Sequence, residues 1–184
     1  SLEGKRAQPR FKPPFPAVEG AWKSPTAVNN VETLCNVPLV MTRGADWFAA
    51  LGPEKNGGPK LYCVSGHVKR PGVYEAPMKI SLRELIYERA GGIRGDHKLK
   101  AVIPGGSSVP ILLDHELDIP ASFDDVQKAG SMLGSAGIIV MDETTCMVWA
   151  AENLLHFYQH ESCGKCTPCR EGTDWLLKLL KKVE

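Results

Sequence analysis

The sequence has 184 residues, with 22 Lys and Arg against 21 Asp and Glu, so its formal net charge is +1. This balance excludes the strongly basic field that attracts nucleic acid, and we predict no nucleic-acid partner. No apolar run reaches the roughly 18 to 20 residues that span a bilayer, so we predict no direct membrane insertion. The first residues show neither a secretory signal nor an initiator Met, and we interpret the chain as a piece of a longer protein.

Residues 1–57 change character part-way along. The first 30 residues are rich in proline, and the run Pro9–Pro16 predicts an extended segment that is neither a helix nor a central strand. From Asn30, a good N-cap, apolar residues follow at helical spacing. Pro38 should kink or break this helix, which then resumes in two short pieces before a Gly- and Pro-rich loop at 52–60.

Residues 58–143 are typical of a small α+β unit. The predicted strands are short, apolar and separated by turn signals, and they cover 61–65, 73–75, 100–103 and 137–142. The sequence Ser81-Leu82-Arg83-Glu84 is a capping box, which predicts a helix that ends at Gly91-Gly92. A few strands with one helix laid across them indicate a β-grasp-like module.

Residues 144–184 have the pattern of two helices. The apolar face of the first consists of Met147, Ala151, Leu154, Leu155 and Tyr158, and that of the second of Leu176, Leu179, Leu180 and Val183. Two amphipathic helices joined by a cysteine-rich loop predict part of a helical bundle.

Three of the six cysteines are scattered along the chain. Cys35, Cys63 and Cys146 lie among mainly apolar residues, where a free thiol behaves as a small hydrophobe. We therefore expect them to be buried and free. A reducing compartment fits this pattern better than an extracellular one.

The other three cysteines form a C-x2-C-x2-C motif. Iron–sulfur clusters use this spacing, because each thiolate must reach a different iron of one cube. The predicted ligands of a [4Fe–4S] cluster are Cys163, Cys166 and Cys169. Lys165 and Arg170, within and just after the motif, would offset the negative charge of the thiolates and sulfides.

A structural zinc site is the main alternative for these thiols. Zinc usually takes two ligand pairs separated by a longer insert, and although no second cysteine pair is present, His156 and His160 could complete such a site. A bacterial-ferredoxin run would place its fourth cysteine at position 173, which is Thr173. We therefore expect the fourth cluster ligand to lie beyond Glu184 or not to be a thiol.

The motif and three other segments resemble one known family. Glu161–Gly172 resembles the cluster signature of the NADH-binding flavoprotein subunit of respiratory complex I, the NADH-quinone oxidoreductase. Ser1–Gly4, Lys12–Pro16 and Asn29–Thr33 are similar to further segments of that family, in the same order. The resemblance covers essentially the whole chain.

The resemblance implies a fold of three parts in the α+β class. Residues 1–57 would be the tail of a Rossmann-like domain for FMN and NADH, and 58–143 a soluble-ligand-binding β-grasp module. Residues 144–184 would begin a helical domain that carries the cluster. The family's flavin cradle and most of its nicotinamide pocket would precede Ser1, so we expect the chain by itself to be inactive.

The resemblance also implies a reaction. In this family NADH passes a hydride to FMN, and single electrons then pass to a [4Fe–4S] cluster and on toward quinone. It places Asn29, Asn30 and Thr33 at the FMN phosphate, Phe15 on the NADH adenine and Lys12 beside it. No residue here is expected to be catalytic, because hydride transfer to a flavin is the cofactor's chemistry.

Partners and location follow from the same resemblance. The expected neighbours are the complex's smaller subunit with a [2Fe–2S] cluster and its larger iron–sulfur subunit. The expected location is cytoplasmic and peripheral on the bacterial inner membrane, or the matrix side in a mitochondrion. The alternatives are the related diaphorase subunit of an NAD-linked hydrogenase or formate dehydrogenase, a zinc-stabilised interaction module, and a β-grasp binder of the cobalamin type.

Overall fold

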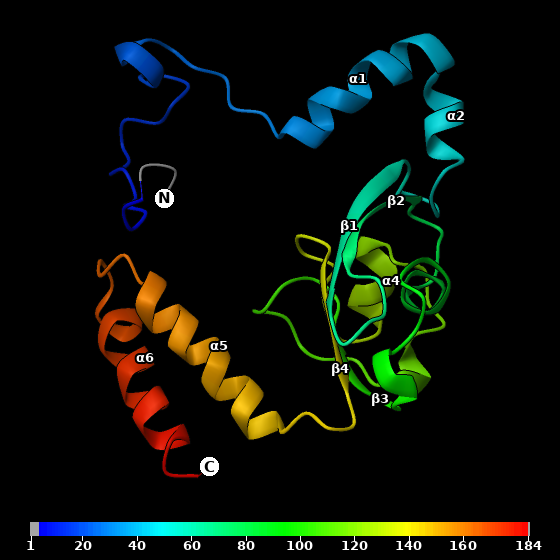
Figure 1. Cartoon of the computed structure of the whole chain (residues 1–184). Helices are drawn as coiled ribbons and strands as arrows, with labels where there is room; N and C mark the ends of the chain where they lie inside the picture. Colours follow the sequence, from blue (N-terminus) through cyan, green and yellow to red (C-terminus); the bar gives the residue numbers. More distant parts are fainter. Residues whose placement is uncertain (1–3, 184) are drawn as a thin grey trace. The chain divides into compact units, whose positions relative to one another are not determined.

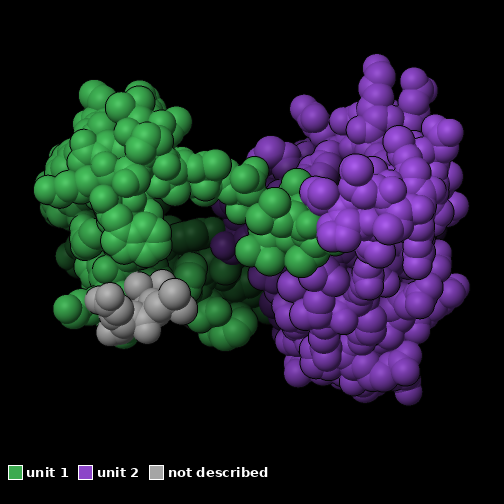
Figure 2. Space-filling view, turned by 90° about the horizontal axis from the view of Figure 1, so that it is seen from above, with its two compact units in different colours: residues 1–35, 146–184 green, residues 36–145 purple. Residues whose placement is uncertain are grey.

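The computed structural model describes residues 4–183 (Figure 1). The resemblance noted for Ser1–Glu3 lies outside these residues. The chain divides into two compact units, coloured separately in Figure 2. The described part of one unit comprises residues 4–35 and 146–183, and the other unit is Asn36–Thr145.

The helices and strands follow one another along the chain. The α-helices are α1 (Val31–Arg43), α2 (Ala45–Ala49), α3 (Leu82–Glu84), α4 (Phe123–Lys128), α5 (Met147–Glu161) and α6 (Thr167–Leu180). The strands are β1 (Pro59–Gly66), β2 (Gly72–Pro77), β3 (Leu99–Ile103) and β4 (Gly137–Asp142). None of the described helices is long and apolar enough to cross a bilayer.

The four predicted strands are confirmed, and they form one mixed sheet in the order β2-β1-β4-β3. Strand β1 pairs antiparallel with β2 and parallel with β4, and β4 pairs antiparallel with β3. In the parallel pair Gly66 lies opposite Val140. Gly66 adopts a φ of +83°, and a Cβ there would come within 2.2 Å of the Val140 carbonyl oxygen, so this position requires glycine.

The core of this unit lies between the sheet and the short helices that cover it. Tyr62 and Val64 alternate on β1 with exposed neighbours, as expected for a strand with one buried face. The Tyr62 hydroxyl donates a hydrogen bond of 2.7 Å to the Ala121 carbonyl, which satisfies the only polar atom of that side chain. The largest fully buried side chains around it include Leu82, Leu85, Ile86, Ile138 and Val140.

The predicted helix at 81–92 is present but divided. The Ser81 hydroxyl caps it by accepting the Glu84 N–H at 3.0 Å, as the capping box predicts. After α3 the chain continues as a π-helical turn, Leu85–Arg89, and stops at Gly91, whose φ is +78°. Helix α4 was not predicted, although Ser122 caps it by accepting the Asp125 N–H at 3.2 Å.

Helix α1 corrects one expectation. Pro38 was expected to kink or break this helix, and the break is wrong, because α1 runs from Val31 to Arg43 with Pro38 inside it. A proline removes one backbone hydrogen bond, and the bonds of the turns on either side continue the helix past it. The Thr42 hydroxyl also donates to the Pro38 carbonyl at 2.9 Å, which ties the turn that follows the proline.

The prediction that the scattered cysteines are buried is also wrong, because Cys35, Cys63 and Cys146 are all exposed. Cys63 lies between two buried residues of β1 and therefore points to the opposite face of the strand. Cys35 belongs to α1, none of whose residues is buried, and Cys146 is the N-cap of α5. Apolar neighbours in the sequence did not determine which face each thiol occupies.

The two predicted helices at the end of the chain are confirmed as α5 and α6. They lie side by side within their unit (Figure 1). The Gln159 side chain of α5 donates a hydrogen bond of 2.8 Å to Asp174 of α6, and Leu177 of α6 is buried. The cysteine motif lies in the chain between them and in the first turn of α6.

Candidate functional site

The cysteine loop, defined here as residues 162–169, begins where α5 ends and reaches into the first turn of α6. Cys163 is half-buried in the loop, Cys166 is the N-cap residue of α6, and Cys169 lies in the first turn of that helix. All three thiols are free. The loop therefore gathers the three predicted ligands around one helix N-terminus, where unpaired N–H groups favour negative charge.

Residues other than the cysteines hold the loop in shape. The Arg170 Nη1 donates to the Gly164 carbonyl at 2.8 Å, which closes the loop back onto α6. Gly164 has a φ of +74°, a conformation that other residues rarely adopt, and its N–H donates to the Ser162 hydroxyl at 3.3 Å. The Ser162 Oγ lies 3.4 Å from the Cys169 Sγ.

The donor set fits an iron–sulfur cluster. Among the described residues, no group of three or more His, Cys, Asp or Glu side chains is arranged to hold a single metal ion. A cube spreads its thiolates, one to each iron, so its ligands need not converge on one point. His160, which the zinc alternative would use, lies with its Nδ1 3.2 Å from the Glu161 carboxylate.

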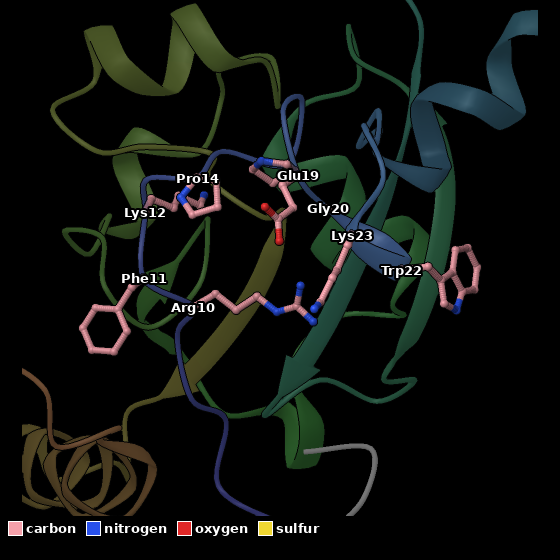
Figure 3. Close-up of a pocket in the computed structure, with 9 residues that line it drawn as sticks. Arg10, Phe11, Lys12, Pro14, Glu19, Gly20, Trp22 and Lys23 are labelled. Atoms are coloured by element: carbon pink, nitrogen blue, oxygen red, sulfur yellow. The ribbon is translucent and has the colours of Figure 1, made fainter.

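The proline-rich arm, residues 9–25, contains a cavity of about 500 Å3 (Figure 3). Lys12 lines this cavity, and Arg10, Glu19 and Lys23 point toward one another across it. Phe15 is not among the lining residues and is 58% exposed. The structure therefore places Lys12 and Phe15 on the same arm without bringing them into one pocket.

The residues predicted at the flavin phosphate gather at the start of α1. Asn29, Asn30 and Thr33 are all exposed. The Asn30 Oδ1 accepts the Thr33 N–H at 3.2 Å, so this side chain is a helix cap in the structure. Amides and a hydroxyl around a helix N-terminus are also donors that suit a phosphate group.

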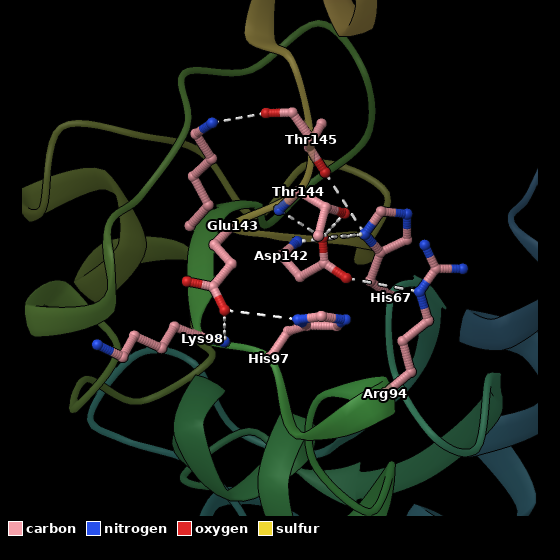
Figure 4. A network of polar contacts seen from close by, with 9 residues as sticks. His67, Arg94, His97, Lys98, Asp142, Glu143, Thr144 and Thr145 are labelled. Carbon is pink, nitrogen blue, oxygen red and sulfur yellow. Dashed lines mark hydrogen bonds and ion pairs between the residues drawn. The ribbon is translucent and has the colours of Figure 1, made fainter.

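Sequence reasoning missed a buried polar network at one edge of the sheet (Figure 4). Asp142, at the end of β4, is fully buried, and one of its oxygens lies 2.9 Å from the His67 Nδ1. The same oxygen accepts the Thr144 hydroxyl at 2.6 Å, and the other lies 3.5 Å from the Arg94 Nε. Because β1 and β4 are parallel, the residues that end them meet at one edge, and this is the signal that could have predicted the pair.

Burial alone would raise the pKa of Asp142. The hydrogen bonds from Thr144 and His67 outweigh burial and lower that pKa from 3.8 to about 2. Asp142 is therefore a carboxylate at neutral pH, held by a hydroxyl and two groups that can carry positive charge.

Comparison with known proteins identifies the region around the cysteine loop. Residues 149–184 match the NADH-ubiquinone oxidoreductase-F iron-sulfur binding region. Over all of its length the chain is 59% identical to the NADH-quinone oxidoreductase F subunit 2 of Rhizobium meliloti (strain 1021) and 55% identical to the F subunit of Mycobacterium tuberculosis (strain ATCC 25618 / H37Rv). The chain belongs to the family of NADH-quinone oxidoreductase F subunits. It spans 44% and 41% of the lengths of these two relatives.

Two further matches bear on this family assignment. Residues 60–140, which include the whole sheet except the first residue of β1 and the last two of β4, match the SLBB domain. The crystal structure of an NAD+-reducing [NiFe]-hydrogenase in the air-oxidized state aligns with this chain at 38% identity and a TM-score of 0.81. The alignment covers 99% of this chain and 31% of the hydrogenase chain. This chain and part of one chain of that hydrogenase therefore share this fold.

Proposed function

We propose that the chain is the part of an NADH dehydrogenase subunit that receives electrons from a flavin and holds a [4Fe–4S] cluster through Cys163, Cys166 and Cys169. One observation supports this most directly. The three free thiols lie in the loop before α6 and in the first turn of that helix, inside the region that matches the iron–sulfur binding family. When bound, FMN accepts a hydride from NADH, and the cluster carries single electrons onward toward quinone.

The described residues have separate tasks in this proposal. The exposed ring of Phe15 stacks on the adenine of NADH, and Lys12 supplies a positive charge beside the nucleotide. Asn29, Asn30 and Thr33 bind the FMN phosphate at the start of α1. No side chain here exchanges a proton with substrate, since the reaction requires only that NADH and flavin be held in contact.

The proposed domain organisation has three parts. Residues 1–57 form the tail of a Rossmann-like FMN and NADH domain, and 144–184 form the first helices of a bundle. Residues 58–143 form a β-grasp module, which the SLBB match at 60–140 and the single mixed sheet support. We infer that this module packs within the enzyme rather than binding cobalamin.

The proposed partners are other iron–sulfur subunits of the same complex, namely the smaller one with a [2Fe–2S] cluster and the larger one. The proposed location is peripheral on the cytoplasmic side of a bacterial inner membrane, or on the matrix side in a mitochondrion. An equivalent role in an NAD-linked hydrogenase or formate dehydrogenase is the second candidate. The alignment with an NAD+-reducing [NiFe]-hydrogenase favours the hydrogenase over the formate dehydrogenase.

Metal analysis of the protein purified with its complex tests the proposal. The expected result is iron without zinc at the site, together with a brown absorption that dithionite bleaches. Removing Cys163, Cys166 and Cys169 together should remove this signal and leave any other clusters of the complex unchanged. Zinc at the site, or an iron content that does not depend on these thiols, would contradict the proposal.

The flavin role of Asn30 can be separated from its capping role by Asn30→Asp. Aspartate keeps an oxygen that can accept the Thr33 N–H, so α1 should remain capped. Its added charge should repel the FMN phosphate and weaken flavin retention roughly tenfold. Flavin content after purification measures this effect, with Asn153→Asp on the exposed surface of α5 as a control of equal charge. Full flavin retention would leave Asn30 as a helix cap alone.

A further inference from the structure

The cysteine loop contains two cations, Lys165 and Arg170, and the structure gives them different surroundings. The Arg170 Nε lies 2.9 Å from the Glu171 carboxylate, so its charge is largely compensated by its neighbour. Its Nη1 closes the loop through the Gly164 carbonyl, and its Nη2 lies 3.4 Å from the Thr167 hydroxyl. Arg170 is thus bound on three sides and shapes the loop.

Lys165 stands between Cys163 and Cys166, and no carboxylate among the described residues pairs with it. Its ammonium group lies 4.6 Å from the centre of the Phe11 ring, which belongs to the proline-rich arm. The face of an aromatic ring attracts a cation through its quadrupole. This contact holds the lysine in place and leaves its positive charge uncancelled.

We propose that Lys165 sets the reduction potential of the cluster in this loop, and that Phe11 positions Lys165 for that task. The inference rests on the proposed function. The step concerned is the uptake of one electron, supplied by NADH through the flavin, and no bond in the protein forms or breaks. Reduction adds one negative charge, which a nearby uncompensated cation stabilises more than it stabilises the oxidised state. Lys165 therefore favours the reduced cluster.

An EPR-monitored redox titration of the intact complex tests the role of Lys165. Lys165→Gln should leave the iron content unchanged and move the midpoint potential to a more negative value. At the wild-type midpoint the ratio of reduced to oxidised cluster should fall roughly three- to tenfold, the scale of one partly screened charge. Lys178→Gln is the matched control, because Lys178 lies on α6 with its charge paired to Asp174 at 2.6 Å. An unchanged midpoint with full iron in Lys165→Gln would overturn the proposal.

Two more variants separate positioning from structure. Arg170→Gln should reduce iron retention, since it opens the loop at Gly164. Phe11→Leu should shift the midpoint in the same direction as Lys165→Gln but by less, and should add nothing in the Lys165→Gln background. If Phe11→Leu shifts the midpoint potential equally in the wild-type and Lys165→Gln backgrounds, Phe11 does not act by positioning Lys165. If the three cysteines of the wild-type complex bind no iron, the proposed function itself is contradicted. This outcome differs from an unchanged midpoint potential in Lys165→Gln, which contradicts only the role of Lys165.

Discussion

Replacing Cys166 with alanine should abolish the iron–sulfur signal of this chain and lower electron transfer from NADH to quinone by more than about 100-fold. Loss of the partners that orient a metal's ligands typically costs about 10- to 100-fold, and a lost ligand should cost more. Cys166 makes no side-chain cap bond to α6, so the helix should persist without the thiol. EPR of the purified complex and its NADH:quinone activity measure the effect.

Cys166→Ala should retain the first step of the reaction, the reduction of the flavin by NADH. Reduction of an artificial acceptor by NADH at the flavin should remain close to wild type, because that step does not pass through the cluster. Cys63→Ala is the matched control, since Cys63 is an exposed free thiol on β1, outside the cysteine loop. A normal four-iron signal from Cys166→Ala would exclude Cys166 as a ligand.

The second large effect is expected at the buried carboxylate of the sheet. Asp142→Asn should destabilise the Asn36–Thr145 unit by about 2 kcal/mol, because it removes the charge that faces His67 and Arg94 in a buried site. Hydrogen exchange of the β1 and β4 amides measures the loss. The control is Asp118→Asn, whose pairing with Arg83 is exposed and should contribute little.

The stabilisation by Asp142 should depend on pH in a defined direction. Its pKa is lowered to about 2 in the folded protein, so the unfolded chain binds more protons between about pH 4 and pH 2. The contribution is therefore complete above about pH 4 and decreases as the pH falls toward 2. The difference between wild type and Asp142→Asn should narrow over this range, and a constant difference would show that the charge of Asp142 does not cause it.

Local sequence rules predicted the parts of the protein that depend on near neighbours. The spacing of the three cysteines indicated a cluster site, and the Ser81 capping box predicted the cap of α3. Helical periodicity predicted α5 and α6, and both helices are present, although the buried residue of α6 is Leu177 and not one of the predicted stripe. Each of these features is determined within a few residues along the chain, where helix geometry fixes which side chains meet.

Local rules failed where the surrounding element, and not the residue's own neighbours in the sequence, determined the structure. Pro38 lacks one hydrogen-bond donor, but the turns around it are intact and α1 continues. Cys63 has apolar neighbours, but side chains alternate between the two faces of β1, and Cys63 lies on the exposed face. A residue's burial depends on the face that its element presents to the core, and composition does not specify that face.

The sequence by itself determined the family, the cysteine ligands to propose and the strands of the sheet. Only the tertiary structure decided which distant residues meet. His67 and Asp142 form a pair because parallel pairing brings the ends of β1 and β4 to one edge of the sheet. Lys165 and Phe11 meet because the proline-rich arm and the cysteine loop belong to one compact unit. Such contacts depend on strand register and on the packing of segments far apart in the chain, and no local pattern of residues encodes them.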